Sequence, residues 1–321
     1  MALSLDLEQQ TVVDTPGSVI CLAGPGSGKT RTLVAKAEGL WAANEDLICL
    51  TFTRSAAQEM RDRMPGIPAR TVHSFCLEWV GWKGNYTQML TDFQVSKWKP
   101  KYSWALVDEV QDLTQNQMDV VLSIAGESIF AVGDPYQSIY GFGGALGGEA
   151  VNLLKSKGCR PMPIKNNYRS NPKIVKLLNG IYPRGLVSAG EKFNGLTAVL
   201  ARTNKLVQEV SLGLTELGIA HCIRLYDGET GEFREESFGD TTLKVMTCHA
   251  SKGLEFDYVI LYDPDIDLKG RERFTLVQAS RKYPEERNLY YVSASRASRG
   301  FTEALSITQV FSAIERRDTN G

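Results

Sequence analysis

The sequence predicts an α/β protein of two domains, each built on a parallel sheet covered by helices. Short apolar runs alternate with segments of helical periodicity, a pattern typical of parallel strands joined by helices. These runs fall into two sets, and 321 residues are enough for a core in each of two domains. A glycine-rich loop follows the first run and precedes a helical pattern. The strand–loop–helix order at this point fits the same fold class.

The predicted strands are apolar runs bounded by turn residues. They lie at 19–22, 47–52, 104–107 and 129–132 in the first set and at 198–200, 243–246 and 258–261 in the second. Helices are predicted at 55–64, 116–125, 172–179 and 205–217. A glycine-rich stretch at 143–149 and a basic stretch at 155–163 separate the two sets. We therefore place the domain boundary after Lys157, which gives domains at 1–157 and 158–321.

Two segments lack a clear period. Residues 78–101 are rich in aromatic side chains and lysine, and we expect them to be irregular. Residues 227–240 are acidic and punctuated by glycine, which indicates a solvated loop.

Composition narrows the possible functions. A net charge of −1 excludes a global basic field, so any nucleic-acid contact must come from a local groove. The six cysteines are scattered without a CxxC pair, which predicts neither a disulfide framework nor a zinc site and favours a reducing compartment. We expect no signal peptide, no transmembrane segment and no membrane partner. The expected location is the cytoplasm, or the host cytoplasm if the source is viral.

The loop AGPGSGKT at 23–30 predicts a phosphate-binding loop, with Ala23 where the strict pattern has its first glycine. Its glycines let backbone N–H groups surround a phosphate, and the following helix adds a favourable field. Lys29 can reach the β- and γ-phosphates, and Thr30 can bind Mg²⁺. A chance glycine turn is disfavoured by the strand before it and the helix after it. The predicted ATP ligands here are Gly24, Pro25, Gly26, Ser27, Gly28, Lys29, Thr30 and Arg31.

Two acids, Asp108 and Glu109, follow the apolar run at 104–107. Such a pair after a strand is usually a helix cap or a solvated turn. Beside a phosphate-binding loop it has another use, because Asp108 can hold Mg²⁺ and Glu109 can polarise the attacking water. The two motifs together predict hydrolysis of a nucleoside triphosphate.

The motifs, taken in order, resemble those of the UvrD/Rep type of superfamily 1 DNA helicase. They are LDLEQ at 5–9, TFT at 51–53, TVHSF at 71–75, DEVQD at 108–112, GDPYQSIY at 133–140, NYRS at 167–170, VMTCHASKGLEF at 245–256 and EERNLYYVSASRA at 285–297. The resemblance implies two RecA-like domains of the P-loop NTPase class, with ATP and Mg²⁺ in a cleft between them. It also implies an ATP hydrolase that moves along single-stranded DNA as a 3′-to-5′ translocase or helicase, with a role in DNA repair or replication.

The resemblance further implies residue roles in ATP chemistry. Gln9 would read adenine through its amide, and Tyr168 would pack on the base. Arg169 and Arg296 would stabilise the transferred phosphoryl charge, although a lone arginine is more commonly a surface ion pair. Two polar residues complete the set, with Gln137 sensing the γ-phosphate and Glu255 bonding near the ribose or phosphates.

Strand contacts are implied at Thr51, Phe52, Thr53, His73, Tyr140, Phe142 and His249. Aromatic stacking on bases tolerates any sequence, which suits a translocase. We assign Phe75 to the core, and His249 could equally brace its own loop. The expected partner is single-stranded DNA, with duplex DNA as a second candidate, and no protein partner is predicted.

The chain departs from this family at three places. Gly143 stands where relatives have an arginine, which predicts weaker strand binding. The large helical insertions are reduced to 78–103 in the first domain and to the acidic segment in the second. The short insertion could be a single-strand platform, because Lys83, Lys97, Lys99 and Lys101 lie among four of the five tryptophans, at 79, 82, 98 and 104. Its alternative is an aromatic mini-core with snorkelling lysines.

Two other functions stay open at this point. A plain P-loop ATPase acting as a switch or kinase would be indifferent to DNA. A non-enzymatic DNA-binding accessory protein would have no need of Lys29, Glu109 and Arg296.

Overall fold

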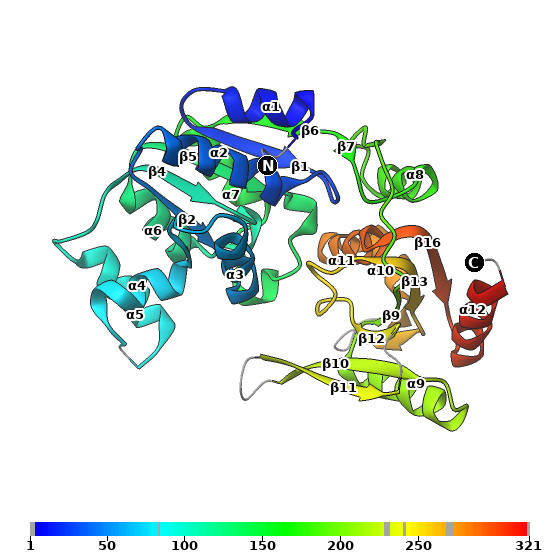
Figure 1. The fold of residues 1–321 in the computed structure, drawn as a ribbon. Coiled ribbons are helices and arrows are strands. Elements are labelled where there is room, and N and C mark those ends of the chain that lie inside the picture. The colour runs from blue at the N-terminus through cyan, green and yellow to red at the C-terminus, as the bar shows by residue number, and fades with distance from the viewer. Residues whose placement is uncertain (1–3, 83, 228–231, 240–241, 268–272, 320–321) are drawn as a thin grey trace. The chain divides into compact units, whose positions relative to one another are not determined.

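The computed structural model describes residues 4–82, 84–227, 232–239, 242–267 and 273–319 (Figure 1). The chain divides into two compact units, Met1–Asn166 and Asn167–Gly321. Each unit contains a six-stranded sheet with helices packed against it. These are the two RecA-like domains that the sequence predicts.

The first sheet has the strand order β3-β2-β4-β5-β1-β6, and every pairing in it is parallel. Its strands are β1 (Val19–Ala23), β2 (Leu47–Thr51), β3 (Ala69–Thr71), β4 (Tyr102–Val107), β5 (Ala125–Gly133) and β6 (Arg160–Ile164). The four strands predicted in the first set are confirmed. Because all the strands run the same way, their carboxyl ends share one edge, and the loops of the predicted site leave from that edge.

Helices cover both faces of the first sheet. They are α1 (Leu7–Asp14), α2 (Lys29–Ala42), α3 (Arg54–Arg63), α4 (Val72–Val80), α5 (Tyr86–Val95), α6 (Gln115–Ile124) and α7 (Gly148–Ser156). In β1, Val19 and Cys21 pack with Leu33 of α2 in one core cluster, while Ile20 packs with Phe75 of α4 in the other. A strand buried on both sides reads as an unbroken apolar run, which is why β1 was visible in the sequence.

The second sheet has the order β11-β10-β12-β9-β13-β16. Its strands are β9 (Thr197–Ala201), β10 (His221–Asp227), β11 (Glu232–Phe238), β12 (Leu243–Thr247), β13 (Phe256–Tyr262) and β16 (Ala297–Ala304). Its helices are α8 (Pro172–Ile181), α9 (Asn204–Glu216), α10 (Leu276–Lys282), α11 (Pro284–Ser295) and α12 (Ile307–Thr319). The strands predicted in the second set are confirmed.

Short elements complete the two units. The two-stranded pairs are β7 (Asn166–Asn167) with β8 (Val187–Ser188), and β14 (Ile266–Asp267) with β15 (Arg273–Phe274). Three single 3₁₀ turns are η1 (Val110–Asp112), η2 (Pro135–Gln137) and η3 (Gly141–Gly143).

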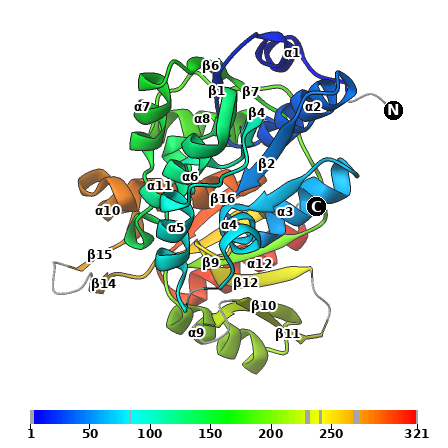
Figure 2. The ribbon, with the colours of Figure 1, turned by 90° about the vertical axis from the view of Figure 1, so that its left-hand side faces the viewer.

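The prediction of a solvated loop at 227–240 is wrong for most of that segment. Glu232–Phe238 form β11, which pairs antiparallel with β10 and lies at the edge of the sheet, next to β10 in Figure 2. Charged side chains are common on edge strands, where they discourage pairing with other chains, so an acidic composition did not exclude a strand. Residues 228–231 and 240 of the predicted loop lie outside the described residues.

The expectation of irregular structure at 78–101 is also wrong in part. Helix α4 continues to Val80, and α5 runs from Tyr86 to Val95 beside it (Figure 1). Asn85 caps α5 by accepting a 2.7 Å hydrogen bond from the Gln88 backbone N–H. Met89, Leu90 and Phe93 bury one face of the helix.

The boundary between the units follows Asn166, later in the chain than the expected boundary after Lys157. The reason is β6, which pairs with β1 from Arg160 to Ile164 and so belongs to the first sheet. No helix among the described residues is long and apolar enough to cross a membrane. All six cysteines are buried and free.

Candidate functional site

The glycine-rich loop joins the carboxyl end of β1 to the first turn of α2. Gly26 and Gly28 have φ angles of 67° and 79°, which only glycine adopts without strain. A Cβ on Gly28 would lie 2.7 Å from Gln9 Nε2, too close for any real contact. The loop therefore needs glycine at this position for conformation and for space.

Two internal hydrogen bonds and the Lys29 ammonium shape the loop. Ser27 Oγ donates to Gly24 O at 2.7 Å, and Gln9 Nε2 donates to Ser27 O at 2.8 Å. Lys29 is 9% exposed, and its Nζ donates a long 3.5 Å bond to Gly24 O. A buried cation held this weakly by a neutral carbonyl favours an anionic ligand.

Gln9 has a structural task that the motif did not reveal. Its Oε1 accepts a 3.1 Å hydrogen bond from the Asp6 backbone N–H, which completes the cap of α1. Its Nε2 holds the loop at Ser27. The amide thus ties the start of α1 to the glycine loop, and adenine reading by Gln9 stays a prediction.

Thr30 and Asp108 meet although 78 residues separate them in the sequence. Thr30 Oγ1 donates to Asp108 Oδ2 at 3.1 Å, and Asp108 is 2% exposed. Burial raises the pKa of the Asp108 carboxyl, and the Glu109 carboxylate adds to the rise, whereas Lys29 and Thr30 oppose it. A hydroxyl and a buried carboxylate that converge in this way fit Mg²⁺, which prefers oxygen ligands and would relieve the unfavourable charge.

Hydrogen bonds connect Glu109 to Gln137 through Gln111 and Asp134, two residues that were not selected as site residues from the sequence. Gln111 Nε2 donates to Glu109 Oε2, and Gln111 Oε1 accepts from the Asp134 backbone N–H at 3.0 Å. Asp134 Oδ2 accepts from Gln137 Nε2 at 2.8 Å. Gln111 and Asp134 lie inside the motifs at 108–112 and 133–140, which was the signal available for finding them.

The backbone around this chain of hydrogen bonds is tightly constrained. Glu109 has a φ of 49°, a left-handed conformation that is rare outside glycine and is concentrated at functional sites. A Cβ on Gly133 would lie 2.5 Å from Gln111 Oε1. Glycine at 133 therefore lets the Gln111 amide pass close to the end of β5.

In the second unit, the two predicted arginines meet around Ser295 and Leu254. Arg169 Nη1 donates to Ser295 O at 3.0 Å, and Arg296 Nη2 donates to Ser295 Oγ at 2.9 Å. Arg296 Nη1 also donates to Leu254 O at 3.3 Å. Both arginines are at least nine-tenths buried, so neither is an ordinary surface ion pair.

Glu255 connects Arg169 with a lysine that the motifs missed. Arg169 Nη2 lies 2.6 Å from Glu255 Oε1, and Lys192 Nζ lies 3.0 Å from Glu255 Oε2. Burial alone would raise the pKa of Glu255, but these two cations lower it to about 2. Lys192 follows β8 in a segment without periodicity, so only the fold brings it here.

The residues predicted to contact a strand lie at the carboxyl edges of the two sheets. In the first unit Phe52 follows β2, His73 follows β3, and Tyr140 and Phe142 come after β5. The rings of Phe52 and Tyr140 are 5.7 Å apart, and those of Tyr140 and Phe142 are 6.2 Å apart. In the second unit His249 follows β12 and is half-buried.

The residues predicted to contact a strand differ in how exposed their side chains are. Phe142 is 82% exposed and Thr53 is exposed, while Phe52, His73 and Tyr140 are half-buried. Thr51 is 1% exposed, so its side chain lies beneath this surface rather than on it. Thr53 also caps α3 by accepting from the Ala56 N–H at 3.2 Å. Phe75 lies in the core as expected.

The aromatic side chains of the insertion at 78–103 differ in their exposure. Phe93 is buried, whereas Trp79, Trp82, Tyr86 and Trp98 are about half or more exposed. The ring of Tyr86 lies 4.6 Å from His73 and 5.2 Å from Trp82. Lys97 and Lys101 are exposed and Lys99 bonds to Gln94 O, while Lys83 lies outside the described residues. The role of this surface as a strand platform stays a prediction.

Two family models match parts of the chain. Residues 9–143 match the family described as AAA domain, and residues 223–302 match the family described as UvrD-like helicase C-terminal domain. These two matches, together with curated DNA helicase relatives, support a UvrD/Rep-type helicase. The two matched segments contain Lys29, Asp108 and Glu109 in the first unit and Glu255 and Arg296 in the second.

Curated relatives of this chain are longer proteins. A probable DNA helicase of Mycoplasma pneumoniae is 27% identical over 228 residues, which cover 60% of this chain and 42% of that protein. The ATP-dependent DNA helicase Rep of Buchnera aphidicola is 34% identical over 171 residues, which cover 52% of this chain and 23% of that protein. The match to this chain therefore spans less than half of each relative.

Solved structures support the fold. A Pif1 helicase chain, described as showing the structural basis for DNA unwinding at forked dsDNA by two coordinating Pif1 helicases, matches with a TM-score of 0.50 and 13% identity. The match covers 99% of this chain and 98% of that chain. At this identity the likeness concerns the fold alone.

Proposed function

We propose that the chain is an ATP-dependent motor that hydrolyses ATP with Mg²⁺ and moves along single-stranded DNA. The observation that carries the proposal is the contact between Thr30 and Asp108 beside the buried Lys29 ammonium. This arrangement offers a cation for the phosphates and oxygen ligands for a metal in one place. The names of the relatives, which are ATP-dependent DNA helicases, support the same activity.

In this proposal the residues of the first unit bind and orient the substrate. The loop N–H groups from Gly24 to Thr30 surround the β-phosphate, and Lys29 reaches the β- and γ-phosphates. Thr30 and Asp108 would hold Mg²⁺, which would neutralise charge on the phosphate oxygens. Glu109, oriented by the Gln111 amide, polarises the attacking water. Gln137 senses the γ-phosphate and passes its state through Asp134 and Gln111 to Glu109.

The second unit supplies the arginines in this proposal. Arg169 and Arg296 would bind the γ-phosphate of ATP, and Tyr168 would pack on the adenine. Arginine fingers contribute roughly 10³–10⁵ in rate. Because Arg169 is paired with Glu255, it exchanges a carboxylate for a phosphate oxygen when ATP binds, and Lys192 keeps Glu255 neutralised.

Hydrolysis removes the γ-phosphate that both arginines would bind, so in this proposal the domains open and close once per ATP. Alternating strand affinity would convert this cycle into stepping. Phe52, His73, Tyr140, Phe142 and His249 are the proposed strand contacts, with stacking worth about 1–3 kcal/mol per base. The 3′-to-5′ direction, duplex unwinding and a role in repair or replication are further parts of the proposal that the family resemblance suggests.

The deciding experiment compares ATPase rates with and without single-stranded DNA for the wild type, Lys29→Ala and Lys157→Ala. Lys157 is an exposed lysine of the same unit and serves as the matched control. We expect strong stimulation by DNA in the wild type and Lys157→Ala, and loss of turnover in Lys29→Ala. Turnover that ignores DNA would favour a switch or kinase, and DNA binding without turnover would favour an accessory protein.

Direction can be measured on single strands blocked by streptavidin. A 3′-to-5′ motor hydrolysing ATP should speed the release of streptavidin from a biotin at the 5′ end and leave the 3′ block unchanged. The opposite pattern would refute the proposed polarity while leaving the motor activity intact.

A further inference from the structure

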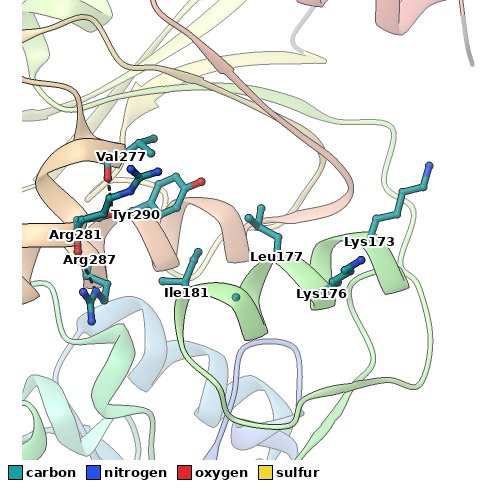
Figure 3. Close-up of a pocket in the computed structure, with 10 residues that line it drawn as sticks. Lys173, Lys176, Leu177, Ile181, Val277, Arg281, Arg287 and Tyr290 are labelled. Atoms are coloured by element: carbon teal, nitrogen blue, oxygen red, sulfur yellow. Dashed lines mark hydrogen bonds between the residues drawn. The ribbon is translucent and has the colours of Figure 1, made fainter.

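A hollow in the second unit has no part in the proposed ATP chemistry. It lies between α8, α10 and α11 and has a volume of about 670 Å³ (Figure 3). This is within the range of roughly 300–1,000 Å³ that is usual for ligand sites. All of its lining residues come from this one unit, so the hollow belongs to the second unit alone.

Four cationic side chains line the hollow from three helices. Lys173 and Lys176 project from α8, Arg281 from α10 and Arg287 from α11 (Figure 3). No acidic residue is among the described lining residues. Within the described part of the chain, Lys173, Lys176 and Arg281 form no salt bridge. Like charges gathered without counter-ions repel one another, so the site favours an anionic ligand.

The part of the hollow between these cations is apolar. Leu177 and Ile181 of α8 line it between the lysine side and the arginine side, and Val277 of α10 lines it beside Arg281 (Figure 3). Arg287 is fixed there, because its Nε donates to Ser280 O at 2.9 Å. The site therefore offers a hydrophobic floor with cations on both sides.

An apolar floor with cations on both sides suits some kinds of anionic ligand better than others. A single-stranded nucleic acid would need exposed ring faces for its bases. Among the lining residues that the structure describes, the only ring is Tyr290, which is 7% exposed and donates its hydroxyl to Glu303 at 2.6 Å. A peptide with an apolar side chain between acidic residues uses both the floor and the cations.

We propose that this hollow, the α8–α10–α11 pocket, binds an acidic segment of a partner protein. An apolar side chain of the segment enters between Leu177, Ile181 and Val277. Its flanking carboxylates pair with Lys173 and Lys176 on one side and with Arg281 and Arg287 on the other. The site is independent of ATP hydrolysis, so it stands or falls separately from the motor function.

The test uses the full chain and fluorescein-labelled synthetic peptides. Each peptide is an aspartate-rich sequence of about twelve residues with one leucine, whose position is moved along the series. A matched peptide carries serine in place of the leucine. We expect at least one leucine peptide to bind in anisotropy titrations about tenfold more tightly than the serine peptide, because its leucine is buried on binding.

Three variants and one control variant locate the binding. Lys176→Glu and Arg281→Glu should each weaken the leucine peptide several-fold, whereas Lys205→Glu, an exposed charge reversal on α9, should not. Leu177→Asn should remove the advantage of leucine over serine while leaving the circular dichroism spectrum unchanged.

Two results would overturn the proposal. One is equal binding of all leucine peptides and the serine peptide, which would mean general charge attraction. The other is displacement of the leucine peptide by single-stranded or duplex DNA whose own affinity falls in Lys176→Glu, which would make the pocket a nucleic-acid site.

Discussion

At the scale of single residues, Glu255 should make the stability of the second unit depend on pH. Its pKa in the folded chain is lowered to about 2 from an ordinary value of 4.5 by Arg169 and Lys192. A depressed carboxylate pKa contributes stability above the unfolded value, and that contribution disappears as pH falls toward the folded value. Glu255 should therefore stabilise the second unit fully at neutral pH and progressively less between about pH 4.5 and pH 2.

Urea unfolding of wild type and Glu255→Gln at pH 7 and pH 3 would measure this contribution. We expect the difference between their midpoints to be clear at pH 7 and to shrink at pH 3. Glu216→Gln, at an exposed position on α9, controls for general charge effects. A midpoint difference that stays constant with pH would contradict the ion-pair explanation.

Gln111 gives a second prediction at the scale of one residue. Replacing it with methionine keeps an apolar shape of similar volume but removes both of its hydrogen bonds, to Glu109 and to the Asp134 N–H. Because Glu109 would lose its orientation, we expect kcat for ATP hydrolysis to fall by about 10²-fold while KM changes little. Gln115→Met, at the exposed first position of α6, is the control, and steady-state kinetics with DNA present provides the measurement. An unchanged kcat would show that Glu109 does not depend on this amide.

At the scale of one element, two glycines have opposite roles, one inside α2 and one at its N-cap. Gly39 is exposed in the helix interior with open space around it, so Gly39→Ala should stabilise the chain by about 0.5–1 kcal/mol. Gly28, at the N-cap, has a φ of 79° and would place a Cβ against Gln9, so Gly28→Ala should destabilise by more than that. Thermal unfolding of both variants would measure the pair, and stabilisation by Gly28→Ala would contradict the described loop.

The elements that could be predicted from the sequence were those buried on both faces. An apolar run such as the one at 19–22 has few alternatives to a central strand. Helix α5 was missed although Asn85 and the apolar residues Met89, Leu90 and Phe93 carried its signals. Strand β11 could not be separated from a loop, because its strand character comes from pairing with β10 rather than from apolar side chains.

Some contacts of the candidate site could likewise be predicted from the sequence, and others could not. Thr30 and Asp108 were paired in advance because phosphate-loop chemistry requires a metal ligand from each motif. The path from Gln111 to Asp134 could not be predicted, since it depends on β5 lying between β4 and β1 in the sheet. Lys192 could not be predicted from the sequence either, because only the tertiary structure brings it close to Glu255.

At the scale of the whole molecule, we can predict how the two units behave as separate fragments, because each has its own core and its own functional side chains. Each unit has its own buried core, represented by Ile20 and Phe75 in the first and by Val199 and Val245 in the second. We therefore expect fragments 1–166 and 167–321 to unfold cooperatively on their own.

Fragment 1–166 contains Lys29, Thr30, Asp108 and Glu109 but neither Arg169 nor Arg296. It should bind Mg·ATP, and Lys29→Ala in the fragment should abolish that binding. Its hydrolysis should be slower than that of the full chain by roughly 10³-fold or more, because both arginines are missing. Calorimetric titration with ATP and phosphate-release assays with and without DNA would measure the two properties. A fragment that hydrolysed ATP at the rate of the full chain would show that the second unit supplies nothing to the chemistry, and the proposed roles of Arg169 and Arg296 would have to be abandoned.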